Sequence, residues 1–342
     1  MRKILLSVFA LQALTLSVIG DDQRPKPGGE VAQLSRVRPK YLLVNNDSDT
    51  RSSTITDATD GTADLVAPHS NPVNVMPLVN ATPIFWGVSW QYPSFYSDKI
   101  FGLLRFYDDF QNSSYADAIA EYLPAPLSIA VASPVIDTTP AGSDPNSVLA
   151  EVCANAGYVS DATTHFYPVY SDIPRGSASY CGYHAAGTCF GVPVQFAFFF
   201  NLDNDPGCDP ISPYAPPKGS RLSQKPGSIA GVASMHTQSQ GLAALANVST
   251  HELVETITDP AYFSPSGGSE YWGGWYDSAG NEVEDKCEWT FGPSQTVGLS
   301  NGSVLIGGYY WKLQGVWSNN AEQAGLGYAT QNDQLFGCTS GS

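Results

Sequence analysis

The sequence predicts a single α/β domain with a mixed sheet, flanking helices and disulfide bonds. Strand-like segments alternate with segments of helical periodicity along most of the chain, without an internal repeat. Hydrophobic residues form 42% of the 342 residues, which is enough for a sizeable core. The formal net charge of −16 disfavours nucleic acid as a partner, because phosphate repels an anionic protein.

The N-terminus has the pattern of an export signal. Arg2 and Lys3 precede an apolar run over residues 4–19, and Val18 and Gly20 are small enough for a cleavage site. A membrane anchor is disfavoured, because the run is shorter than the roughly 20 apolar residues that a span needs. We therefore expect a signal peptide over residues 1–20, no transmembrane segment, and a secreted protein, extracellular or in a cell wall.

Residues 21–68 look unstructured, because residues 24–29 cannot form a helix and residues 47–64 are mostly Ser, Thr, Asp and Gly with little to bury. They are expected to form an unstructured arm or a pro-segment, with the folded domain over residues 69–342. Within the domain, Ile100, Leu103, Leu104 and Tyr107 follow helical spacing, and the apolar run over 194–200 predicts a central strand. The other expected strands are 73–90, 127–135 and 164–170; the helices are 96–110, 115–122, 148–156 with Pro145 in its first turn, and 239–258; residues 177–191 form a Cys- and Gly-rich loop, and the turn signal at 300–303 begins a hairpin that continues over 309–317.

Six cysteines in an exported chain indicate disulfides, and six allow fifteen pairings. Cys287 and Cys338 flank the C-terminal segment, so we expect them to pair. Five Asn-x-Ser/Thr triplets mark candidate glycosylation sites. Asn247 belongs to one of them, and we expect it to be unmodified because it lies one helical turn before the motif described next.

The motif His251-Glu-Leu-Val-Glu255 is the sharpest chemical signal. On a helix, His251 and Glu255 project from one face one turn apart, the spacing at which a helix presents two ligands to one metal ion. Glu252 takes the place of the general base in H-E-x-x-H zinc proteases, so the helix is expected to be a zincin-like site helix. Two alternatives remain: a solvated helix face, and a later helix start at which Ser249 and Glu252 form a capping box.

A third ligand is expected from the acidic segment over residues 277–285. Asp285, close to Cys287, is the first choice and Glu282 the second. The alternative is an ordinary acidic turn.

Several motifs resemble the EXORDIUM-like (phosphate-induced protein) family, whose members are secreted and, in plants, associated with the cell wall. The residues that carry the resemblance are, in chain order, Asn74–Val79, Pro83–Trp90, Tyr180–His184, His251–Glu255 with Thr258–Pro260, and Gly280–Cys287. The resemblance runs from about residue 69 to the end and implies the compartment, the fold and a shared His-Glu-x-x-Glu and acidic-Cys pair. The chain departs from the family before residue 69 and in its extended loop over 189–226.

Together these features predict a metal-dependent hydrolase, first a metallopeptidase. His251, Glu255 and Asp285 would bind one divalent metal ion. Zinc is the first choice, and manganese and calcium are the alternatives because carboxylate oxygens are harder ligands than imidazole nitrogen. Glu252 would act as general base on a peptide substrate, and an oxyanion donor would come from His184, His236 or Tyr262. The alternative is a non-catalytic matrix or wall protein with a structural metal, or one whose aromatic segment over 272–276 stacks on a cell-wall polymer. A two-carboxylate glycosidase ranks last.

Overall fold

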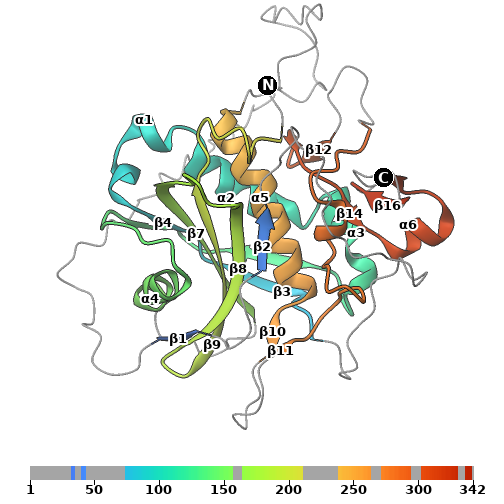
Figure 1. The fold of residues 1–342 in the computed structure, drawn as a ribbon, viewed down its shortest axis with the longest axis horizontal. Helices are drawn as coiled ribbons and strands as arrows, with labels where there is room; N and C mark the ends of the chain where they lie inside the picture. The colour runs from blue at the N-terminus through green and yellow to red at the C-terminus, as the bar shows by residue number, and fades with distance from the viewer. Residues whose placement is uncertain are drawn as a thin grey trace, which may run out of the picture.

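The computed structural model describes residues 32–34, 40–43, 74–156, 164–210, 238–262, 271–293, 302–329 and 336–340. The expected signal peptide lies outside these residues. Within them, the chain forms a mixed sheet of nine strands with helices beside it, as predicted (Figure 1). The strands of this sheet are β1 (Ala32–Leu34), β2 (Lys40–Leu43), β3 (Leu78–Ala81), β4 (Ile84–Trp86), β5 (Ser128–Val131), β6 (Val135–Asp137), β7 (His165–Pro174), β8 (Tyr180–Cys189) and β9 (Val192–Asn201).

The middle of the sheet follows the order β8-β9-β7-β3-β5. Strand β7 pairs in parallel with β9, β3 and β4, whereas β8 pairs antiparallel with β9, β1 and β2. Phe196, Phe198 and Phe199 of β9 are fully buried, because both faces of this strand are covered. The expected central position of residues 194–200 is therefore confirmed.

Helices cover both faces of the sheet. Figure 1 shows α4 (Pro145–Asn155) and α5 (Gln240–Thr258) on opposite sides of β8, and both helices contact β8 and β9. Helix α2 (Lys99–Phe110) packs against α5 and β5. The remaining elements are α1 (Pro93–Tyr96), α3 (Ser114–Ala118), α6 (Asn319–Ala324), the 3-10 turns η2 (Val88–Gln91), η3 (Ala120–Tyr122) and η5 (Asp285–Cys287), and the short strands β10 (Ala261–Tyr262), β11 (Tyr271–Trp272), β12 (Ser303–Ile306), β13 (Tyr309–Lys312), β14 (Val316–Trp317), β15 (Tyr328–Ala329) and β16 (Phe336–Thr339).

Two sequence expectations differ from the observed elements. The expected loop over 177–191 is wrong, because most of it is the ten-residue strand β8. A Cβ at Gly182 would come within 2.9 Å of both the Phe198 carbonyl oxygen and Val248 of helix α5. The glycine that suggested a loop therefore permits close packing of the helix on the sheet. In the C-terminal hairpin, Gly307 and Gly308 form the turn between β12 and β13, beyond the expected signal at 300–303.

Part of the 21–68 segment belongs to the sheet. Strands β1 and β2 both pair with β8, which differs from the expectation of a wholly unstructured arm. Because the 21–68 segment is mostly polar, its composition gave no indication that the Leu42 side chain is fully buried. Within β2, Lys40 forms an ion pair with Glu282, and Tyr41 packs against Tyr180 and Tyr183. Such contacts between distant segments leave no local hydrophobic pattern in the sequence.

Three disulfides join the six cysteines: Cys153–Cys189, Cys181–Cys208 and Cys287–Cys338. The last confirms the expected pairing. It ties the acidic segment to β16, which lies in the C-terminal three-stranded sheet. Disulfides of this kind fit an oxidising compartment.

Candidate metal centre

Helix α5 is the element on which the site is built. It begins at Ser239, whose side chain accepts a hydrogen bond from the backbone N–H of Leu242. Residues Gly241 to Thr258 are all buried, so the helix lies inside the protein and has no solvated face. The alternative of a later helix start is therefore excluded, because Ser249 lies in the middle of the helix.

The predicted pair on this helix does converge. His251 Nε2 lies 3.1 Å from Glu255 Oε1, and both side chains are at most 1% exposed. Neither atom makes a hydrogen bond. Two ligands held tetrahedrally at about 2.1 Å from one ion are separated by about 3.4 Å, so the spacing of these two atoms fits a shared cation.

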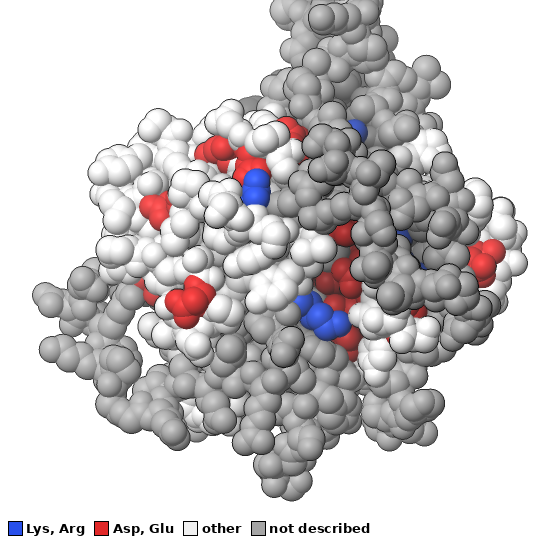
Figure 2. Space-filling model, viewed as in Figure 1, with Lys and Arg blue, Asp and Glu red and all other residues white. Residues whose placement is uncertain are grey.

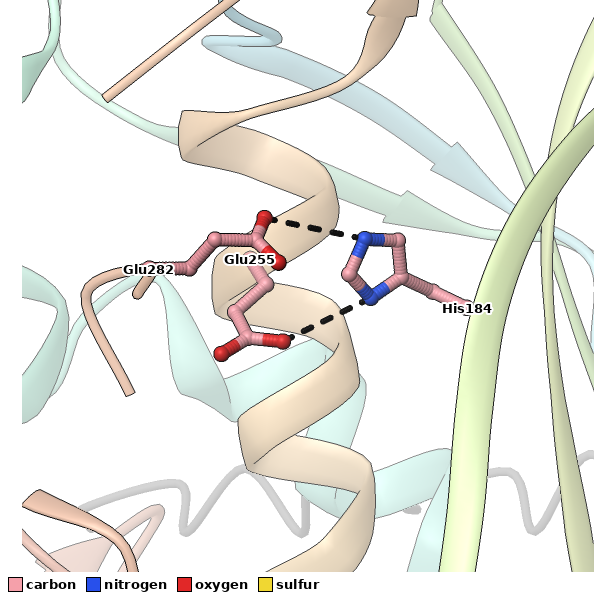
Figure 3. A group of neighbouring side chains, drawn as sticks. All are labelled: His184, Glu255 and Glu282. Carbon is pink, nitrogen blue, oxygen red and sulfur yellow. Dashed lines mark ion pairs between the residues drawn. The ribbon is translucent and has the colours of Figure 1, made fainter. Parts of the chain in front are cut away.

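His184 of β8 completes the buried cluster from the opposite side. Its Nδ1 lies 3.0 Å from Glu252 Oε2 and 3.5 Å from Glu255 Oε2. Figure 3 shows the imidazole between Glu255 and Glu282, with its Nε2 3.7 Å from Glu282 Oε1. Sequence reasoning named His184 only as a possible oxyanion donor, since the strand that carries it was taken for a loop.

The acidic segment contributes both residues that were considered as third ligand. Glu282 is fully buried, whereas the Asp285 side chain is 30% exposed. Asp285 Oδ1 lies 3.7 Å from His251 Nε2, and its other oxygen accepts a hydrogen bond from the Glu282 N–H. Asp285 is thus beside His251, while Glu282 is beside His184.

Two groups of three side chains could each hold a metal ion: His251, Glu252 and Glu255, and His184, Glu255 and Glu282. In each group the ligand atoms lie within 4.8 Å of one another, and Glu255 belongs to both. The chain therefore has buried His and Glu groups suited to a cation, with Glu255 at their junction. Figure 2 shows several groups of acidic side chains on this face of the molecule, some of them with basic side chains beside them.

Gln314 fixes the orientation of the His251 ring. Its amide nitrogen lies 2.9 Å from His251 Nδ1 and donates to Glu284 Oε2, while its amide oxygen accepts from the Trp289 N–H. Because these last two partners set the amide orientation, Nδ1 is the accepting nitrogen and Nε2 carries the proton of the neutral ring. A cation bound through Nε2 would require this proton to move to Nδ1 and the Gln314 amide to accept from it instead.

The cluster is electrostatically unfavourable without a cation. Burial raises the pKa of Glu252 to about 8 and that of Glu284 to about 7. Burial also raises the pKa of Glu255 and of Glu282, and the carboxylates around each add to the effect. For His184, burial and then the charges of Lys40 and His251 lower the pKa. A bound cation would offset the cost of these buried carboxylates.

Other sequence candidates take different places. His236 lies outside the described residues, and the structure gives no side-chain position for Tyr262. Asn247 is fully buried, and its side-chain oxygen accepts from the Gln314 backbone N–H, so the fold leaves no room there for a glycan. Trp275 is half-buried, donates its indole N–H to the Tyr122 carbonyl and packs on that residue's ring.

Comparison with known proteins adds no family to this picture. No protein-family model, no curated protein and no solved structure matches the chain. Among the described helices, none has the length and apolar character that a membrane crossing requires.

Proposed function

We propose that this chain is a secreted metal-dependent hydrolase that cleaves peptide bonds. The observation that carries the proposal is the convergence of His251 and Glu255 on one buried helix. Asp285 lies beside the histidine, and Glu252 follows His251 directly in the sequence. The resemblance of these motifs to the EXORDIUM-like family supports a secreted protein that could act in a cell wall. His251, Glu255 and Asp285 are the proposed ligands. Asp285 belongs to neither of the two groups described above, whereas Glu282, the alternative third ligand, belongs to one of them.

The chemistry follows from the protein side chains. A divalent cation, zinc first and manganese or calcium next, supplies Lewis-acid polarisation of the scissile carbonyl when bound. Glu252 would accept the proton of the attacking water as general base. His184 orients Glu252 through the 3.0 Å contact between Nδ1 and Oε2. His184 is thus a positioning residue here.

Elemental analysis combined with a cleavage assay tests the proposal. Protein purified without chelators should contain about one cation per chain and cleave casein. His251→Ala should lose both properties. His165→Ala, which removes a histidine outside the cluster, should keep both. Glu252→Gln should retain the cation and lose cleavage by a factor of about 10² to 10⁴. A wild-type preparation that binds none of zinc, manganese or calcium would overturn the proposal.

A non-catalytic protein with a structural cation is the second candidate. It is favoured by the engagement of both Glu252 oxygens, one by His184 and the other by the Leu42 N–H. Structural sites are closed in this manner, whereas catalytic sites keep one position open. Under this alternative, Glu252→Gln retains the cation and the wild type shows no cleavage.

A further inference from the structure

Strand β2 lies in a slot between β8 and the residues that follow the acidic segment. On one side, Lys40 is in register with His184 and Leu42 with Gly182. On the other side, Glu288 accepts a hydrogen bond from the Leu43 N–H at 3.0 Å, and the Trp289 indole donates to the Leu43 carbonyl at 3.0 Å. Both backbone edges of this short strand are therefore held, as an endopeptidase holds an extended peptide.

The strand also presents its backbone to the proposed catalytic group. The Leu42 N–H donates to Glu252 Oε1 at 3.3 Å, so a main-chain amide lies against the proposed general base. The Leu42 side chain is fully buried and packs in the hydrophobic core. While β2 is in place, each Glu252 oxygen already has one hydrogen-bond partner.

Lys40 supplies the second recognition contact. Its ammonium lies 3.1 Å from Glu282 Oε2 and 3.5 Å from the Gly280 carbonyl oxygen. Burial by itself would lower the pKa of Lys40, but the charges of Glu282, Asp285, Asp259 and Glu255 outweigh it, and the pKa is raised. Since residues two apart on a strand share a face, Lys40 and Leu42 point toward the site together.

We propose that β2 is an intramolecular occupant of the substrate slot, and that the active protein binds there an extended peptide with a basic residue two positions before a large aliphatic residue. This inference rests on the proposed function and names its substrate class. The chain carries such a segment itself, in Lys40-Tyr-Leu42, and its activity is reduced while that segment fills the slot. Release of β2 frees Glu252 and the edge of β8 together.

Peptide binding to full-length variants tests the inference without turnover. The probe is a fluorescein-labelled synthetic peptide with the sequence Pro-Lys-Tyr-Leu-Leu-Val of residues 39–44, and the measurement is fluorescence anisotropy in metal-free buffer. Leu42→Pro removes the N–H that reaches Glu252 and weakens β2 in the slot. We expect this variant to bind the probe at least about tenfold more tightly than the wild type, in which tethered β2 competes at high effective concentration.

Matched controls make each outcome decisive. Gln33→Pro disturbs β1, which pairs with β8 at Thr188, and should bind the probe no better than the wild type. A probe with Glu in place of Lys should not bind to any form. Equal binding to wild type and Leu42→Pro, or equal binding of the two probes, overturns the inference. If Leu42→Pro lacks a cooperative thermal transition, Lys40→Glu, which repels Glu282, replaces it with the same expected gain.

The failure of this inference can be distinguished from that of the peptidase. If the probe binds but no form of the protein cleaves casein, the slot inference stands and the peptidase proposal fails. Cleavage of casein by a wild type whose Leu42→Pro variant gains no affinity would retain the peptidase and remove the role of β2.

Discussion

The two halves of helix α5 are equally buried but lie in opposite surroundings. In the first half, Leu242, Leu245 and Val248 pack into the hydrophobic core. At the middle, the Ser249 hydroxyl hydrogen-bonds to the Tyr170 hydroxyl, which in turn hydrogen-bonds to the Tyr107 hydroxyl, each link 2.9 Å long. These polar groups are neutral and satisfy one another, so they stay buried at little cost.

The second half of the helix buries ionisable groups that do not satisfy one another. His251 Nε2 and Glu255 Oε1 make no hydrogen bond. The neighbouring Glu282 is held by an ion pair between its Oε2 and Lys40 Nζ at 3.1 Å. An arrangement of this kind costs stability unless a cation compensates it. The comparison teaches that equal burial can stabilise one region and mark another as a site.

Substitutions in the two halves should change the free energy of unfolding in opposite directions. Leu245→Ala should lower the free energy of unfolding by about 2 to 5 kcal/mol, because it leaves a cavity. Glu255→Gln should raise it by about 1 to 4 kcal/mol in metal-free protein at pH 8, because it removes a buried carboxyl from other carboxyls. Urea titrations measure both. Asp108→Asn, an exposed carboxylate on α2, is the control and should change stability by under about 0.5 kcal/mol. Destabilisation by Glu255→Gln in the absence of metal would contradict the comparison.

The stability of the metal-free protein should fall as the pH rises from about 5 to 8. Glu284 has an ordinary pKa of 4.5 and a folded value of about 7, so its stabilising contribution is complete below pH 4.5 and is lost as the pH passes 7. Asp259 acts in the same direction through its folded pKa of about 6. His184 acts oppositely, since its lowered pKa contributes stability that is lost as the pH falls below its ordinary 6.5.

The size of the pH effect follows from the same pKa values. Glu284 alone accounts for about 3 kcal/mol, at about 1.4 kcal/mol for each pH unit between 4.5 and 7. Thermal melts of wild type and Glu284→Gln across this range measure it. The variant should show a shallower decline, and saturating zinc should reverse the trend, because ligands must lose their protons to bind metal. Parallel pH profiles for the two proteins would argue against this assignment.

The smallest effect is expected for the chain of hydroxyls formed by Tyr107, Tyr170 and Ser249. Tyr107→Phe removes its terminal member and leaves Tyr170 hydrogen-bonded to Ser249. The free energy of unfolding should fall by about 1 kcal/mol, the typical contribution of one hydrogen bond, and metal content should be unchanged. Loss of metal in this variant would show that the two clusters are coupled across the helix.

Much of the fold was predictable because it depends on local periodicity. The helical spacing around Leu103, the apolar run of β9 and the long helix ending near Thr258 all appear where the sequence placed them. Strand β8 was missed, because its small residues serve contact with α5 and its alternation is weak. Strand β2 was missed because its segment is polar overall and only Leu42 is fully buried.

By itself, the sequence determined the spacing of His251 and Glu255, since residues four apart on any helix share a face, and it indicated the Cys287–Cys338 pair. Only the tertiary structure decided that His184, on a strand 67 positions before His251, faces the same carboxylates, that Glu282 and Asp285 lie beside different histidines, and that Lys40 enters the cluster. Contacts between segments far apart in the chain arise from packing of the sheet, helix and acidic segment around a common interior, and no local pattern encodes them.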